Sequence, residues 1–298
     1  MAIKDVLVCL DASEAGEGRL RLAAGIAREH KAHLAAAYLM SEFATTDVAV
    51  YGPGAIGIGI AGAPVAHVGE GSGARSNFDQ GRETPQHVLL AETIENRFRE
   101  TLQLDRIVGD WHLFAPGEVG ELIELAMATD LVIVGQHQPE APASAEFRPE
   151  QVVVACGRPL LVVPYAGTFS SIGKRVLVAW DGTREATRAI HDALPLIASA
   201  DAVTVISVAG RKSDVERRHP SLDRIIHHLE RHGLAARAQE DVRDGVMVSD
   251  MLLSRASDLG ADLIVVGAYY HSRFREAVLG GVSRELLDHM TVPVLMSH

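Results

Sequence analysis

Short apolar runs alternate along this chain with longer stretches in which apolar residues recur every three or four positions. Short apolar runs of this kind are typical of strands buried on both faces of a parallel sheet, and the longer spacing is typical of amphipathic helices. In the first half, the pattern predicts strands at residues 4–10, 32–40, 111–114, 131–134 and 160–163. It predicts helices at residues 14–30, 84–102 and 119–128, with Ser13 as an N-cap.

The second half repeats this order. Predicted strands cover residues 175–179, 202–208, 235–242, 263–266 and 294–296, and predicted helices cover 184–198, 221–232, 248–259 and 284–289. The sequences also match: V-L-V-C-L-D-A-S at 6–13 returns as V-L-V-A-W-D-G-T at 176–183, and D-L-V-I-V-G at 130–135 returns as D-L-I-V-V-G at 262–267. The chain is therefore a duplication, because an echo of this length repeats a whole folding unit.

Strands that alternate with helices predict a parallel sheet with right-handed crossovers and helices on both faces. We therefore expect two tandem open three-layer α/β sandwiches, the first over residues 1–166 and the second over residues 172–298. Ligands of such sheets bind in a crevice at the carboxyl ends of the strands. The length of 298 residues fits two domains at about 150 residues each.

Composition narrows the classes of partner. The formal charge of −11 argues against nucleic acid, which is bound through basic patches. The two cysteines, Cys9 and Cys156, lie in apolar runs and do not suggest a disulfide framework, which favours a reducing compartment. No apolar run reaches the roughly 18 residues that span a bilayer. We expect a cytoplasmic protein without membrane contact.

The two halves differ most after their second strand. The offset between equivalent residues is 170 at Asp11 and Asp181 but 132 at Gly135 and Gly267, so the first half holds about 38 additional residues. They fall in a glycine-rich stretch at about residues 42–83. This composition favours a surface loop or linker, and the alternative is a lid or dimer arm, because residues 55–68 are apolar.

The richest candidate for chemistry is the loop that follows the strand at 263–266. Gly267 ends that strand, and Gly280 and Gly281 open the next helix after an excursion through the loop. Backbone N–H groups at a helix N-terminus favour anions such as a nucleotide phosphate. A glycine used only for packing the strand against a helix explains Gly267 almost as well.

The duplicated aspartate-containing first strand, the D-L-I-V-V-G strand, the glycine loop and the P-V-L-M ending resemble the universal stress protein family in its tandem form. The resemblance covers nearly the whole chain. It implies a sheet order of 3-2-1-4-5 in each half, like that of the adenine nucleotide alpha hydrolases. It also implies an internal pseudo-dimer in which residues 160–163 pair with residues 294–296.

The family's nucleotide-binding members carry G-x-x-G, nine residues, then G-[S/T]. Here Tyr270 stands at the second glycine and Gly281 at the hydroxyl position, with Ser283 two residues further on. The loop of the first half lacks the glycine pair and holds Pro139, Pro142 and Pro149 instead, so its phosphate loop is degenerate.

The resemblance therefore implies one adenine-nucleotide site, for ATP or a relative, in the second half alone, with a regulatory role in stress adaptation. In this reading, adenine and ribose meet Ala179, Asp181 and Val208, the sugar meets Val266 and Gly267, and the phosphates meet Gly280, Gly281 and Ser283. Arg273 and Arg275 could add contacts to the phosphates or could simply be solvated.

Other readings stay open. Asp11 with Ser13, and Asp181 with Thr183, precede helices, so both aspartates are also explained as helix caps. His228 and His232 could be a metal pair, but no third ligand is evident and a solvated helix face explains them better. We expect no metal site.

The rival for the whole chain is a nucleotide-free interaction module in which Tyr270 fills the phosphate space and the glycine-rich stretch recruits an unidentified protein partner. A slow nucleotide hydrolase is a third reading. The chain has neither a nucleophile elbow nor a Walker-type loop, so we expect no enzyme. The sequence leaves open whether two chains form a homodimer.

Overall fold

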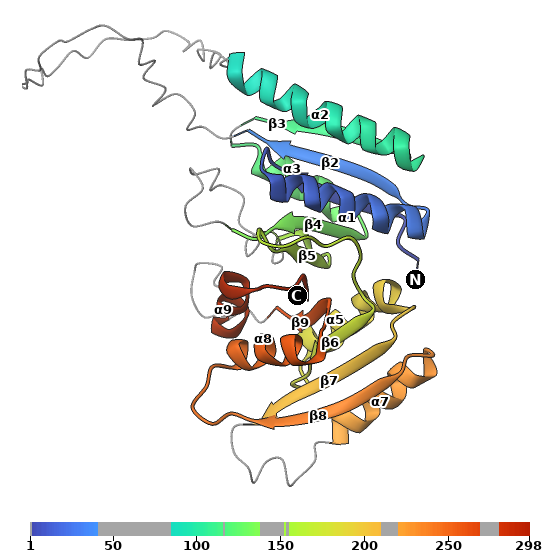
Figure 1. Ribbon diagram of the computed structural model, residues 1–298, viewed down its shortest axis with the longest axis vertical. Coiled ribbons are helices and arrows are strands. Elements are labelled where there is room, and N and C mark those ends of the chain that lie inside the picture. Colours follow the sequence, from blue (N-terminus) through green and yellow to red (C-terminus); the bar gives the residue numbers. More distant parts are fainter. Residues whose placement is uncertain are drawn as a thin grey trace, which may run out of the picture.

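The computed structural model describes residues 2–40, 85–115, 117–137, 152, 155–209, 220–268 and 280–298. In these residues the chain forms a ten-stranded sheet in the order β3-β2-β1-β4-β5-β10-β9-β6-β7-β8. The sheet runs through the molecule from one end to the other (Figure 1). The predictions for residues 42–83, for the prolines of the first loop, and for Tyr270, Arg273 and Arg275 lie outside the described residues.

The first half supplies one end of the sheet. Its strands are β1 (Asp5–Leu10), β2 (His33–Leu39), β3 (Gly109–Phe114), β4 (Leu131–Gly135) and β5 (Leu160–Val163). Its helices are α1 (Glu14–His30), α2 (Pro85–Asp105) and α3 (Val119–Met127). All neighbouring strands of this half are parallel.

The second half repeats the arrangement. Its strands are β6 (Arg175–Ala179), β7 (Ala202–Ala209), β8 (Ala236–Val242), β9 (Leu263–Gly267) and β10 (Val294–Ser297). Its helices are α5 (Arg184–Ile197), α7 (Pro220–Arg231), α8 (Val248–Leu259) and α9 (Gly281–His289). The strand order in each half is 3-2-1-4-5, so the predicted fold class is confirmed.

The start of the last helix matters for the site. The apolar pattern marks residues 284–289 as part of this helix and the glycine pair predicts its start, and α9 indeed begins at Gly281, with Gly280 as its N-cap residue. Ser283 is therefore part of the helix and not of the loop before it. The domain limits at residues 166 and 172 stay a prediction.

The two halves meet at an antiparallel seam between β5 and β10. Val294 lies opposite Val162, Leu295 opposite Leu161 and Met296 opposite Leu160, as the resemblance implied. The strands on either side of the seam therefore run in opposite directions. The carboxyl ends of the first-half strands and those of the second-half strands consequently lie at opposite edges of the sheet.

A buried glutamine ties the seam to a helix of the second half. Gln136 follows β4, is buried, and donates from Nε2 to the carbonyl oxygens of Leu287 at 2.8 Å and Asp288 at 3.2 Å. Both carbonyls belong to the last turn of α9. Since buried amides need partners, this contact fixes α9 against the first half as well as against its own sheet.

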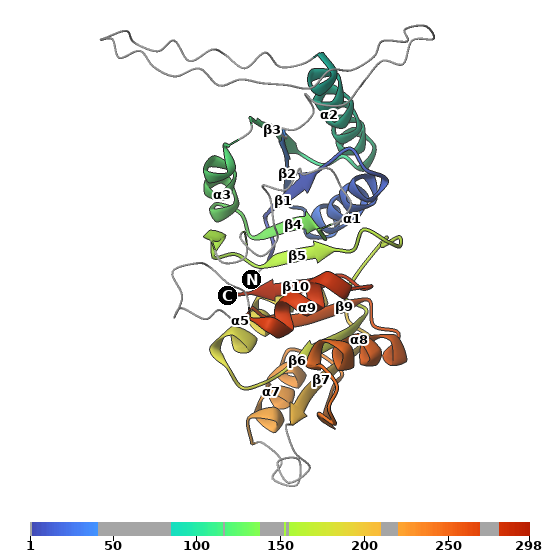
Figure 2. The ribbon, with the colours of Figure 1, turned by 90° about the vertical axis from the view of Figure 1, so that its left-hand side faces the viewer.

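Helices cover both faces of the sheet in each half, as Figure 2 shows from the side. One hydrophobic cluster holds residues of α1, α2, α5 and α7, and a second cluster holds residues of α3, α8 and α9. The alternation of side chains along a strand explains this division, because consecutive residues point to opposite faces. Leu7 belongs to one cluster and both Val6 and Val8 to the other.

Helix starts are set by hydroxyl side chains, as predicted for Ser13. Its Oγ accepts a hydrogen bond from the N–H of Gly16 at 3.0 Å, and Thr183 Oγ1 accepts one from Ala186 at 3.2 Å at the equivalent start of α5. Such caps contribute about 1 kcal/mol each. Among the helices that the structure describes, none is long and apolar enough to cross a bilayer.

Candidate functional site

The carboxyl ends of β6, β7 and β9 place the predicted site residues along one edge of the second half. β6 lies between β7 and β9 and is parallel to both. Ala179 ends β6, Val208 is near the end of β7, and Gly267 ends β9 after Val266. The fold therefore brings these residues to one edge, as the sequence predicted, and Asp181 follows within two residues.

Asp181 orients the capping threonine and does not itself cap the helix. Its Oδ1 accepts hydrogen bonds from the N–H of Thr183 at 3.0 Å and from the Thr183 hydroxyl at 2.6 Å. Thr183 then accepts from the N–H of Ala186. The prediction that the aspartate caps α5 directly is thus corrected, because the hydroxyl stands between the carboxylate and the helix. Asp181 is exposed and can offer its remaining carboxylate lone pairs to a ligand.

Gly267 is required by close packing. A Cβ atom at this position would lie 2.5 Å from the backbone N of Ala186 and 2.6 Å from the backbone C of Glu185. Neither backbone atom can move without shifting α5. The first turn of α5 therefore lies directly over the end of β9, and the packing explanation of this glycine is sufficient by itself.

The start of α9 offers unoccupied backbone donors. Its N-cap residue Gly280 has no side chain, and no side-chain hydrogen bond caps the helix among the described residues. A Cβ atom at Gly281 would meet none of the described residues within 4 Å, so that part of the chain does not cover the first turn. Ser283 is only 3% exposed and lies on the buried side of α9 with Leu286 and Leu287. The N–H groups of this turn, more than the Ser283 hydroxyl, are therefore available to an anion.

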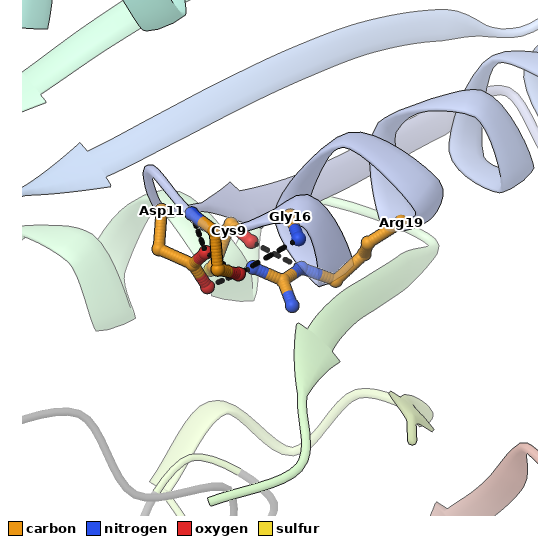
Figure 3. A network of polar contacts seen from close by, with 5 residues as sticks. Cys9, Asp11, Gly16 and Arg19 are labelled. Atoms are coloured by element: carbon orange, nitrogen blue, oxygen red, sulfur yellow. Dashed lines mark hydrogen bonds and ion pairs between the residues drawn. The ribbon is translucent and has the colours of Figure 1, made fainter. Parts of the chain in front are cut away.

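The equivalent edge of the first half carries an arginine. Arg19 lies on α1, is only 3% exposed, and reaches back to the end of β1 (Figure 3). Its Nε donates to the carbonyl oxygen of Cys9 at 2.7 Å, and its Nη2 pairs with Asp11 Oδ2 at 2.5 Å. Gly135 at the end of β4 leaves room for it, since a Cβ atom there would lie 2.2 Å from Arg19 Nη1.

The second half has Ala189 at the position of Arg19, since the offset between α1 and α5 is 170. Ala189 is 1% exposed, so both residues point into the core, but only the first half places a cation there. The sequence reading missed Arg19. Aligning the two halves would have shown it, because a charged residue stands where the copy has a core alanine.

The arginine also sets the charge state of its partner. Burial raises the pKa of Asp11, but the nearby Arg19 guanidinium and the hydrogen bonds from Ser13 and Arg19 hold that pKa below its usual range. The carboxylate is therefore ionised at neutral pH. Asp11 also accepts hydrogen bonds from the N–H and hydroxyl of Ser13, so the pair braces the start of α1.

The two cysteines are unsuited to nucleophilic chemistry. Both are buried and unpaired. Burial raises the pKa of Cys9 to about 12 and also raises the pKa of Cys156, which keeps both thiols protonated at neutral pH. A thiol needs its thiolate form to react.

A third imidazole joins the two histidines that the sequence singled out. His191 on α5 lies with its ring centroid 4.9 Å from that of His228, which is 4.7 Å from that of His232. Burial and the neighbouring His191, His232 and Arg231 lower the pKa of His228. Among the described residues, however, no group of three His, Cys, Asp or Glu side chains has an arrangement that could hold a metal ion. The rings pack against one another instead, with His191 tilted by 38° to His228 and His232 edge-on to it at 65°.

Comparisons with known proteins agree with this geometry. The profile of the universal stress protein family matches residues 173–298. A solved universal stress protein from Archaeoglobus fulgidus DSM 4304 is similar over 98% of this chain and 95% of its own, with 14% identity and a TM-score of 0.69. A functionally unknown protein from Pseudomonas aeruginosa PAO1 is similar over 99% of this chain and 92% of its own, with 15% identity and a TM-score of 0.62. No curated protein sequence matches the chain.

Proposed function

We propose that this chain, whose residues 173–298 match the universal stress protein family, is a cytoplasmic stress-response protein that binds ATP or another adenine nucleotide in its second half. The nucleotide acts as a regulatory ligand and is not turned over. The site lies at the edge formed by Ala179, Asp181, Val208 and Gly267 and ends at the first turn of α9.

The observation that carries this proposal is the start of α9. Among the described residues, its N-terminal N–H groups lack a side-chain cap and no neighbour lies within 4 Å of a Cβ atom placed on Gly281. Three such donors and the helix dipole stabilise a phosphate by charge-assisted hydrogen bonds. Asp181, exposed at the end of β6, supplies acceptors for a ribose or adenine at the other end of the ligand.

One nucleotide per chain follows from the difference between the halves. In the first half the Arg19 guanidinium, Asp11 and the Cys9 carbonyl already satisfy one another at the edge of the sheet. The carboxylate that corresponds to Asp181 is thus engaged in an ion pair. A nucleotide would have to break that pair before it could use Asp11.

Calorimetric titration with ATP and with ADP tests the proposal, with binding of one nucleotide per chain as the expected result. The variant Gly281→Asp should abolish the heat, because it adds a negative charge where the phosphates would bind and its Cβ meets no neighbour. Aspartate in a first helical turn also stabilises the helix, so loss of binding would not reflect unfolding.

Gly120→Asp is the matched control. Gly120 is the second residue of α3, and a Cβ atom there also meets nothing within 4 Å. The control adds the same charge to a first turn of the other half and should bind as the unaltered protein does. If the unaltered protein binds no nucleotide at millimolar concentration, the proposal is wrong and the interaction module gains support. Time-resolved product analysis then separates a regulatory ligand from a slow hydrolase, which would release ADP steadily.

A further inference from the structure

A cavity lies at the amino ends of β6, β7 and β8, near the opposite edge of the second half from the proposed nucleotide site. Its volume is about 290 Å³. The polar residues that line it are Arg175, Asp201, Thr204 and Arg237, and Leu259 and Ala261 close the side next to α8. Pockets with a few convergent polar groups on an apolar wall are the usual form of a small-molecule site.

The strand register places Arg175, Thr204 and Arg237 on one face of the sheet. Thr204 pairs with Arg237 across β7 and β8. Arg175 lies two residues before Leu177, and Thr204 two residues before Ile206, and both apolar residues belong to the cluster under α8 and α9. Because side chains two residues apart share a face, the arginines of β6 and β8 flank the cavity from its two sides.

The guanidinium groups keep most of their donors for a ligand. Arg237 Nε donates to Thr204 Oγ1 at 2.9 Å, and Arg175 Nη1 makes a long contact of 3.4 Å with the Leu259 carbonyl oxygen at the end of α8. In the described part of the chain, neither arginine has a carboxylate within ion-pairing distance. Thr204 is 3% exposed and lines the cavity, and its hydroxyl, which accepts from Arg237, keeps its own proton for donation.

In the first half, a side chain fills the space that corresponds to this cavity. Asp5 occupies the position of Arg175, and Asp110, paired with Ala35, occupies the position of Arg237, paired with Thr204. Between them, His33 lies 3.7 Å from Asp5 and 3.1 Å from Asp110. In the second half, Ala202 pairs with Arg175 as His33 pairs with Asp5 in the first. The second half thus reverses both flanking charges and removes the side chain that joins them.

We propose that this cavity binds a small anion that presents two or more oxygens, a phosphate or a carboxylate, held between Arg175 and Arg237 with a hydrogen bond from Thr204. The anion takes the bridging place that His33 holds between two aspartates in the first half. Asp201 at the rim opposes the anion, so the lining carries two cationic groups against one anionic group. The C-terminal end of α8, with its exposed carbonyl groups, also lies at this edge, and Arg175 donates to the last of them, that of Leu259.

The test uses inorganic phosphate and succinate as separate probes, with binding followed by calorimetry at constant ionic strength so that general screening does not vary. The background is the Gly281→Asp protein, in which the proposed nucleotide site is blocked. At least one probe should bind, and Arg237→Ala and Arg175→Ala should each weaken it by roughly tenfold or more, as expected for a lost hydrogen bond to a charged group. Preference for one probe over the other identifies the source of the anion.

Two further variants keep the test decisive. Ala202→Glu places a carboxylate from β7 between the arginines, as His33 stands between the aspartates, and should abolish binding while raising the thermal midpoint. Asp201→Asn should tighten binding. Arg224→Ala removes an exposed arginine from α7 of the same half and should change nothing.

The anion proposal is wrong if neither probe binds. It is also wrong if the Arg237→Ala variant binds the probe as tightly as the background protein that keeps Arg237. Because the Gly281→Asp background is designed to block the proposed nucleotide site, failure of the anion proposal and failure of the nucleotide proposal are separate results. Circular dichroism of each variant shows that lost binding is not lost structure.

Discussion

The two halves of this chain have one fold, but they stabilise the equivalent edge, at the carboxyl ends of their strands, in different ways. In the first half, α1 sends the buried Arg19 to Cys9 and Asp11. In the second half, α5 has an alanine there and its first turn packs directly on Gly267. The first half thus holds its edge with an internal ion pair, and among the described residues Asp181 of the second half has no such pair. Two copies of one backbone can therefore support the same crevice with different side chains.

The largest expected effect on stability distinguishes the two equivalent glycines, Gly267 at the end of β9 and Gly135 at the end of β4. Gly267→Ala would drive a Cβ atom to within 2.6 Å of the backbone of Glu185 and Ala186, and should destabilise the second half by about 3 kcal/mol, the upper range for overpacking. Gly135→Ala meets the end of the Arg19 side chain, which can move, and should cost clearly less. Denaturant unfolding of both variants measures the difference. Equal destabilisation would show that the two edges are packed alike.

A smaller effect is expected from the arginine itself. Arg19→Met keeps the length of the side chain but removes the guanidinium bonds to Asp11 and Cys9, and should lower the free energy of unfolding by about 2 kcal/mol. The double variant with Gly135→Ala should lose less stability than the sum of the two single losses, because methionine leaves space for the new methyl group. Fully additive losses would mean that Arg19 and Gly135 are not in contact in solution.

The smallest effect concerns pH. The pKa of Asp11 is lowered in the folded protein, so its stabilising contribution is present above the ordinary aspartate pKa of about 3.9 and is lost as the pH falls through the lower folded value. The stability difference between the unaltered protein and Arg19→Met should therefore shrink below about pH 4. Asp11 is half exposed, so the change should stay under about 1 kcal/mol. A difference that is constant from pH 7 to pH 3 would contradict the ion pair.

The sequence was sufficient for the elements and their order. α1, α8, β5 and β6 begin and end at the predicted residues, because their apolar periods are clear and Ser13 marks the start of α1. The seam between β5 and β10 came from the resemblance and is confirmed. The apolar pattern marks only residues 284–289 of α9, and the glycine pair before them gave its start, which the structure confirms at Gly281.

The side-chain networks could not be predicted in the same way. His33 reaches Asp5 and Asp110, which are 28 and 77 residues away along the chain, only because β1, β2 and β3 lie side by side in a fixed register. The contrast with Arg175 and Arg237 also depends on that register, because the pairing between β6 and β7 starts one residue earlier than the pairing between β1 and β2. A constant offset of 170 matches Asp5 with Arg175, but it would have matched His33 with Val203 in place of Ala202.

The antiparallel seam has a consequence for assembly. Two separate copies of such a domain would associate through β5 and β10 only as far as their concentration allowed, whereas here both edges belong to one polypeptide and the union is intramolecular. Dilution cannot separate them. Each edge strand is also covered by the other, so neither can recruit a foreign strand at this place. The covalent link thus makes a permanent pair of unlike partners, in which each half keeps the other as a fixed neighbour.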